Sequence, residues 1–135
     1  MRVVITQSNF FPWKGYFDLI HDADLFVFLD DVQFTKRDWR HRNHIKFHTG
    51  LRWLRASVIE DVTARIDEIR FKNTTWPKET LQICSDAYRK APYFNWLLPL
   101  LEEVFYDRKW EKLSELNRYI IGRISRDYLG IKTPF

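Results

Sequence analysis

The sequence predicts an α/β protein with a Rossmann-like parallel sheet begun by a βαβ unit, a β-hairpin insertion and a helical C-terminal half. A short apolar strand, a helix and a second apolar strand follow one another within about thirty residues, the order of a βαβ unit with parallel strands. Apolar residues then recur every three or four positions through the second half, as on amphipathic helices. With 135 residues, 45% of them hydrophobic, we expect one packed domain over residues 1–135.

The βαβ unit comes first. Residues 3–5 predict the first strand, residues 14 to about 22 the helix, and residues 25–29 the second strand. In open parallel sheets, ligands bind beyond the carboxyl ends of the strands, so the loops after these two strands form the candidate site. The helix carries an apolar stripe that should face the sheet, formed by Tyr16, Leu19, Ile20 and Ala23.

The middle of the chain predicts further strands. Residues 45–48 and 51–55 flank Thr49-Gly50, which indicates a β-hairpin with a two-residue turn. Residues 66–71 are expected to form another strand.

Three amphipathic helices are predicted in the second half of the chain. The first starts near Trp76-Pro77 and continues to about residue 90, because proline is favoured in the first turn of a helix. The second covers residues 97–105, with Pro99 as a possible site of a kink. The third covers residues 113–128 and should end at Gly130 in the C-cap role.

Charge is concentrated in one segment. The net charge of the chain is +4, but residues 36–55 carry seven Lys and Arg and one Asp, a local net charge of +6. We expect an anionic partner to bind there. Four net charges and the lack of an RNA- or DNA-binding motif argue against a nucleic-acid partner.

Cellular location is predicted from what the chain lacks. The single Cys84 cannot form an internal disulfide, the N-terminus has no apolar signal-peptide core, and no run approaches the length of a membrane span. We therefore expect a cytoplasmic protein without membrane insertion. The sequence leaves its oligomeric state open, a homo-oligomer included.

The loop after the first strand carries candidate binding residues. Gln7 and Asn9 could bind a sugar hydroxyl or a base edge, or could only satisfy main-chain groups of the loop. Pro12 and Gly15 lie where a ligand can approach the backbone, although Gly15 also suits a tight helix entry. Tyr16 lies on the apolar stripe, where core packing competes with substrate binding.

Asp30 and Asp31 close the second strand and are the candidate catalytic residues. A carboxylate at this edge could accept the proton of an amine nucleophile or hold Mg²⁺. Because adjacent strand residues point to opposite faces, we expect only one of the two to reach the site. A capped turn is the alternative interpretation.

The basic segment supplies the candidate anion binders. Arg42 beside Asn43 offers a planar donor fork next to an amide, which suits a diphosphate or a carboxylate. A solvated basic face is the alternative. The full set expected to bind substrate here is Lys36, Arg37, Arg42, Asn43 and Lys46.

No metal site is predicted. His41, His44 and His48 would share a face only on a helix, whereas the Thr49-Gly50 turn places this segment in a hairpin. Cys84 lies on the buried stripe of its helix and is expected to be an inert core thiol.

Two long runs resemble the WbqC-like protein family. Residues 7–20 read QSNFFPWKGYFDLI, and residues 24–37 read DLFVFLDDVQFTKR, followed by Trp39, Arg42-Asn43 and Ile45-Lys46. A looser likeness continues through residues 87–94 and 128–133. The resemblance implies a bacterial protein of O-antigen or surface-polysaccharide gene clusters that transfers glycine or a similar acyl group onto an amino sugar. Family members usually continue past the equivalent of Phe135, so a short form, a fragment or a binding half are all compatible with it.

A weaker resemblance is to nucleotidylyl-transferase domains, which open with the same strand, loop, helix and strand. Their Gly-His pair corresponds to Gly15-Tyr16 here, and a phenol cannot fully replace the imidazole.

The sequence thus predicts an acyl or aminoacyl transferase acting on a nucleotide-activated amino sugar. A sugar-nucleotide-binding module without catalysis and an adenylate-forming enzyme are the alternatives. No cofactor is fixed by a motif; ATP with Mg²⁺ and an acyl donor are the candidates.

Overall fold

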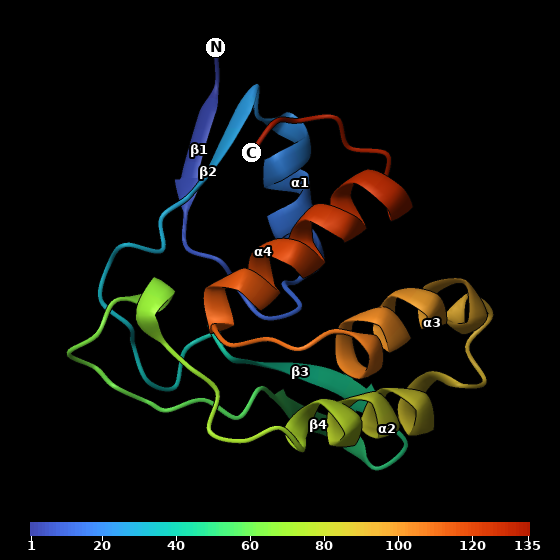
Figure 1. The fold of residues 1–135 in the computed structure, drawn as a ribbon. Coiled ribbons are helices and arrows are strands. Elements are labelled where there is room, and N and C mark those ends of the chain that lie inside the picture. The colour runs from blue at the N-terminus through green and yellow to red at the C-terminus, as the bar shows by residue number, and fades with distance from the viewer.

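The computed structural model describes all 135 residues (Figure 1). Two pairs of strands and four α-helices are joined by short helical turns. In chain order the elements are β1 (Val3–Thr6), α1 (Lys14–Asp22), β2 (Leu25–Phe28), β3 (Arg42–Phe47), β4 (Gly50–Arg55), the 3₁₀ turn η1 (Ile66–Glu68), α2 (Trp76–Tyr88), α3 (Phe94–Glu102), the π-helical turn η2 (Glu103–Asp107), α4 (Leu113–Arg123) and the π-helical turn η3 (Ile124–Tyr128).

The predicted βαβ unit is confirmed. β1 and β2 pair in parallel, with Val3 opposite Leu25 and Thr6 opposite Phe28. The sheet has only these two strands, so a larger Rossmann-like sheet does not form among these residues. Its other border is the C-terminal segment, because the Phe26 N–H donates to the carbonyl of Pro134 at 3.0 Å. Figure 1 accordingly places the C-terminus beside β2.

The hairpin is also confirmed, with its turn shifted by one residue. Phe47 lies opposite Gly50, so the turn residues are His48 and Thr49. Gly50 has a φ of +119°, a backbone conformation that residues other than glycine rarely adopt. The shift arises because this glycine begins β4 and does not occupy the second turn position.

The expected strand over residues 66–71 is wrong. Residues 66–68 form η1, and only single bridges follow, at Arg70 and Phe71. Ile66 and Ile69 are both buried, and a spacing of three residues suits a helical turn. The carboxylate of Glu68 accepts from the Arg65 N–H at 2.8 Å and closes the turn.

The three predicted helical regions are present. α2 ends at Tyr88, α3 contains Pro99 and continues to Glu102, and α4 is followed by η3. Gly130, with a φ of +65°, follows this last turn in the left-handed conformation expected of a helix end. None of the helices is long and apolar enough to cross a membrane.

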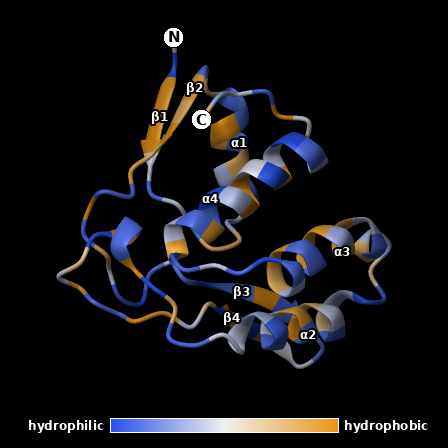
Figure 2. Ribbon diagram, in the orientation of Figure 1, coloured by the Kyte–Doolittle hydropathy of each residue, from blue (hydrophilic) through white to orange (hydrophobic).

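Helix α4 joins two hydrophobic cores. The larger core packs the hairpin, α2 and α3 against one side of α4, including Leu113, Leu116 and Ile120. The smaller core packs α1 and the strongly hydrophobic strand β2 against Ile121 (Figure 2). Figure 1 shows α4 running between these two parts. Its polar residues are therefore brought to the carboxyl ends of β1 and β2.

Candidate functional site

The loops after β1 and β2 lie together at one edge of the sheet, as predicted. The main-chain N–H of Ser8 donates to Asp30 Oδ1 at 2.8 Å, and both residues are fully buried. This contact links the loop that carries Gln7 and Asn9 to the end of β2.

Asp30 also binds helix α4. Its Oδ2 accepts from Ser114 Oγ at 2.6 Å and from Arg118 Nε at 3.0 Å. We call the group Ser8, Asp30, Ser114 and Arg118 the Asp30 junction. With three donors on a fully buried carboxylate, Asp30 is suited to positioning the two loops and Arg118 rather than to receiving a proton from a substrate.

Asp31 has the opposite surroundings. It is exposed and makes no hydrogen bond or ion pair in the structure. β2 ends at Phe28, so both carboxylates lie in the loop after the strand and do not close it, and only that of Asp31 faces solvent.

Arg40, which was not among the predicted site residues, binds the side-chain amides of the loop after β1. Its guanidinium donates to Asn9 Oδ1 and, at 3.3 Å, to Gln7 Oε1, and it pairs with Asp38 at 3.4 Å. Its carbonyl accepts from Asn117 Nδ2 at 2.8 Å. Gln7 and Asn9 are therefore already bonded within the protein, and Arg40 could have been found only as one cation of the basic segment.

The basic segment reaches this edge only in part. Asn43 Nδ2 donates to the carbonyl of Phe11 at 2.6 Å, which ties the hairpin to the loop. Arg42 instead donates to the carbonyl of Arg37 at 2.6 Å and stacks over Trp53 at 4.2 Å. The exposed side chains of Lys36 and Lys46 make no hydrogen bond or ion pair in the structure.

Tyr16 and Gly15 have structural partners. The Tyr16 hydroxyl donates to the carbonyl of Gln7 at 2.9 Å. Burial, together with the nearby Asp30 carboxylate, raises the pKa of Tyr16 far above its usual value of 10. The Trp13 ring covers Gly15 and fills the space that a Cβ would take, so this space is not open to a ligand.

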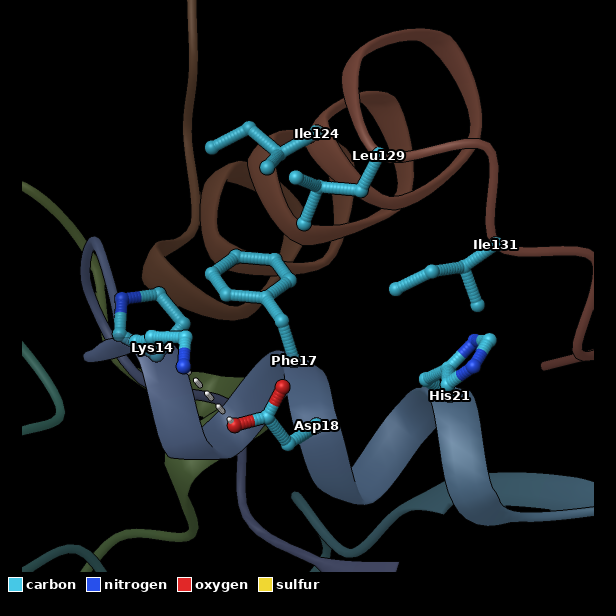
Figure 3. Close-up of a pocket in the computed structure, with 8 residues that line it drawn as sticks. Lys14, Phe17, Asp18, His21, Ile124, Leu129 and Ile131 are labelled. Carbon is cyan, nitrogen blue, oxygen red and sulfur yellow. Dashed lines mark ion pairs between the residues drawn. The ribbon is translucent and has the colours of Figure 1, made fainter.

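Pro12 borders an open cavity of about 540 Å³ between α1 and the segment after α4 (Figure 3). In Figure 3, Phe17 points toward Ile124 and Leu129. Lys14 and Asp18 on the rim pair with each other at 3.9 Å, and the other ionisable side chain of the lining is His21.

The histidines are dispersed. His41 is buried against Phe34 and lies 3.3 Å from Glu60, whereas His44 packs on Trp53. Burial lowers the pKa of His41, although Glu60 acts in the opposite direction. No three His, Cys, Asp or Glu side chains converge in a way that could hold a metal ion.

A pocket of about 400 Å³ adjoins the Asp30 junction, and we call it the arginine pocket. The guanidinium of Arg118 bonds to Asp30 through Nε and lies over the Phe28 ring at 5.5 Å, whereas Arg126 makes no hydrogen bond or ion pair. The rings of Phe28 and Phe135 stack 5.4 Å apart in its wall. No carboxylate side chain lines the pocket, whose residues are Val27, Phe28, Arg118, Tyr119, Gly122, Arg126 and Phe135.

Two guanidinium groups beside aromatic rings, of which only one is bonded to a carboxylate, can bind a phosphate or diphosphate attached to a planar group. Phe28 is the last residue of β2, so the pocket lies at the edge where ligands of parallel sheets bind. Sequence reasoning missed Arg118 on α4 and Arg126 on η3, since only the packing of these two elements brings their side chains to residues of β2 about ninety positions earlier in the chain.

Comparison with known proteins gives two matches. The model of the WbqC-like protein family matches residues 7–135. The uncharacterized protein Rv1507c of Mycobacterium tuberculosis is 40% identical over 136 residues, which cover 98% of this chain and 58% of the relative. The chain thus spans little more than half the length of this relative. No solved structure matches.

Proposed function

Because the chain belongs to the WbqC-like protein family, we propose that it binds a nucleotide-activated amino sugar at the arginine pocket. The proposed reaction is acyl or aminoacyl transfer of the glycine type in bacterial O-antigen or surface-polysaccharide biosynthesis, carried out in the cytoplasm. The observation that carries the proposal is a pair of guanidinium groups at the end of β2: Arg118, which Asp30 holds through Nε alone, and Arg126, which has no ion-pair partner.

Anion binding follows from how Arg118 is held. Its Nε bond to the buried Asp30 fixes the guanidinium of a side chain that is 43% exposed, so its remaining N–H donors can bind an anion with little further loss of side-chain freedom. Arg126 lies against Gly122, 3.3 Å from the position of a Cβ there, and adds a second fork. Together they can hold the diphosphate, while the ring of Phe135, which is 41% exposed and stacks on Phe28, lies beside them for the base or the sugar.

Acyl transfer also requires a base. The sugar amine attacks the acyl carbonyl, the amide bond forms, the donor's leaving group departs with the bonding electrons, and the amine loses a proton. We assign Asp31 as the acceptor of that proton, because it is the exposed carboxylate of the pair, and Asp30 as a positioning residue. The acyl group arrives on an acyl donor or is activated by ATP with Mg²⁺.

A binding module without catalysis is the second candidate. The relative is much longer than this chain, so residues that complete a catalytic site can lie in the part of the relative that has no counterpart here. Testing transfer on this chain and on the longer relative separates the two candidates. Release of pyrophosphate from ATP would instead identify an adenylate-forming enzyme.

The binding test is calorimetry with UDP- and dTDP-amino sugars. We expect Arg126→Ala to weaken binding by about tenfold or more, the effect of losing a hydrogen bond to a charged group. Arg52→Ala removes an exposed arginine on β4 and should leave binding unchanged. If Arg42→Ala abolishes binding and Arg126→Ala does not, the anion site is on the hairpin and the proposal is wrong.

The catalytic test is amide formation with Asp31→Asn. We expect transfer to fall by about 10²-fold or more, as for loss of a general base, with sugar-nucleotide binding retained. Full activity in this variant would remove Asp31 from the mechanism.

A further inference from the structure

An apolar cavity of about 480 Å³ lies between the hairpin, α2, α3 and η3. Its volume is within the usual range for small-molecule sites. No charged residue lines it, and its inner wall includes Leu54, Cys84, Leu97 and Leu101. Phe11, from the loop after β1, forms part of the wall, so the cavity adjoins the polar edge of the sheet.

Large apolar side chains at this cavity remain exposed. The exposed fractions are 76% for Tyr93, 57% for Trp96 and 53% for Leu129. Apolar side chains gathered around a hollow, rather than packed into it, are typical of a binding surface. We infer that this cavity binds a single unbranched acyl chain whose head group is anionic.

The head-group assignment rests on Tyr88. Tyr88 lines the cavity, and its hydroxyl accepts from the Lys46 N–H at 3.1 Å, so the hydroxyl proton has no partner within the protein and can be donated to a ligand oxygen. The exposed residues Arg89 and Lys90 directly follow Tyr88. The nearest carboxylate along the helix, Asp86, already accepts from a glutamine at 3.0 Å. The local charge therefore favours a carboxylate or phosphate head over a cationic one.

The inner wall suits the tail of such a ligand. Cys84 is buried there, and burial raises the pKa of its thiol to about 11. The thiol is therefore neutral at physiological pH and contributes apolar surface. Leu97 and Leu101 lie one turn apart on α3 and extend this surface.

The acyl chain can come from a free fatty acid or from an activated acyl donor. Only its assignment as the donor of the transfer reaction rests on the proposed function. Carboxylate binding is measured without sugar nucleotide, so a failure here is distinct from a failure at the arginine pocket.

The test is calorimetry with hexanoate, octanoate, decanoate and dodecanoate, each below its micelle concentration. Each added pair of methylenes should strengthen binding by about fifteenfold until the cavity is filled, the gain expected for burying them. Decanoate should bind more tightly than decyltrimethylammonium, which has the same tail and the opposite head charge. Tighter binding of decanoyl-coenzyme A than of decanoate identifies the activated donor, and equal binding identifies the free acid.

Two tryptophan variants provide the matched comparison. Ala91→Trp places an indole in the cavity wall and should weaken decanoate binding by tenfold or more. Asn95→Trp adds the same group at an exposed α3 residue outside the lining and should bind as the parent does. Near-ultraviolet circular dichroism confirms that both variants fold. Absence of chain-length dependence, equal binding of the two head groups, or equal loss in both variants would overturn the inference.

Discussion

Replacing Asp30 with alanine should cost the protein a large part of its stability, although this carboxylate lies at the edge where substrates are expected. The side chain is fully buried and accepts from Ser8, Ser114 and Arg118. In Asp30→Ala the Ser8 N–H and the Ser114 hydroxyl stay buried without their acceptor. Each such group costs about 1–3 kcal/mol, so the free energy of unfolding should fall by about 2–6 kcal/mol.

Arg118 adds little to this loss. Its side chain is 43% exposed, so water can solvate the guanidinium once the carboxylate is gone. For a chain of this length the loss corresponds to a fall of roughly 7–21 °C in the midpoint of thermal unfolding. Since natural domains are stable by about 5–15 kcal/mol, the variant should fold but only marginally.

Urea unfolding followed by tryptophan fluorescence measures the effect, with Asp31→Ala as the control. Asp31 is the adjacent, exposed carboxylate, and its removal should change the unfolding free energy by about 0.5 kcal/mol or less. Ser114→Ala should cost less in the Asp30→Ala background than in the parent, because the two groups bond. If Asp30→Ala is no more destabilising than Asp31→Ala, the Asp30 junction does not hold the loops in place.

Three further predictions concern groups near this edge. Burial lowers the pKa of His41, so the unfolded state binds more protons than the folded state near and below about pH 6.5. His41→Gln should therefore flatten the loss of stability on acidification in urea titrations, and an unchanged slope would show that Glu60 balances the effect of burial. Because the pKa of Tyr16 is raised in the folded state, this tyrosine ionises above about pH 10 only in the unfolded state, which lowers stability at alkaline pH. Tyr16→Phe should reduce this alkaline loss of stability, and identical curves of unfolding free energy against pH for variant and parent would contradict the prediction. Gly15→Ala should displace the Trp13 ring and alter fluorescence, with no such change in a Trp13→Phe background.

The sequence predicted local structure better than it predicted the site. The βαβ unit and the helices follow from apolar spacing, and the joining of the two loops follows from parallel pairing. The strand expected at residues 66–71 failed because Ile66 and Ile69 fit a helical turn as well as a strand. Arg118 and Arg126 could not be assigned, since no local pattern reports how α4 packs against β2.

The burial of Asp30 also could not be predicted from the sequence. Its position at a strand end was predicted, but its burial depends on Ser114, which lies 84 residues away in the sequence. The concentration of positive charge in residues 36–55 also predicted poorly which side chains lie at the site. Arg42 stacks on Trp53, whereas Arg40, two residues earlier, reaches the loop.

The position of α4 between two cores has a consequence for how the two parts align. A helix held only by apolar contacts can slip along its axis by one turn, about 5.4 Å, and exchange one leucine or isoleucine for the next at small cost. The polar band on α4 removes that freedom, because Ser114 and Asn117 meet Asp30 and the carbonyl of Arg40 in a single axial position. A shift of the helix by one turn would break both hydrogen bonds, so that their four polar groups would stay buried without these partners. These polar contacts therefore fix the axial position of α4 and, with it, the position of Arg118 relative to β1 and β2. Evolutionary selection should preserve the positions of these polar groups even where the apolar residues around them are exchanged for one another.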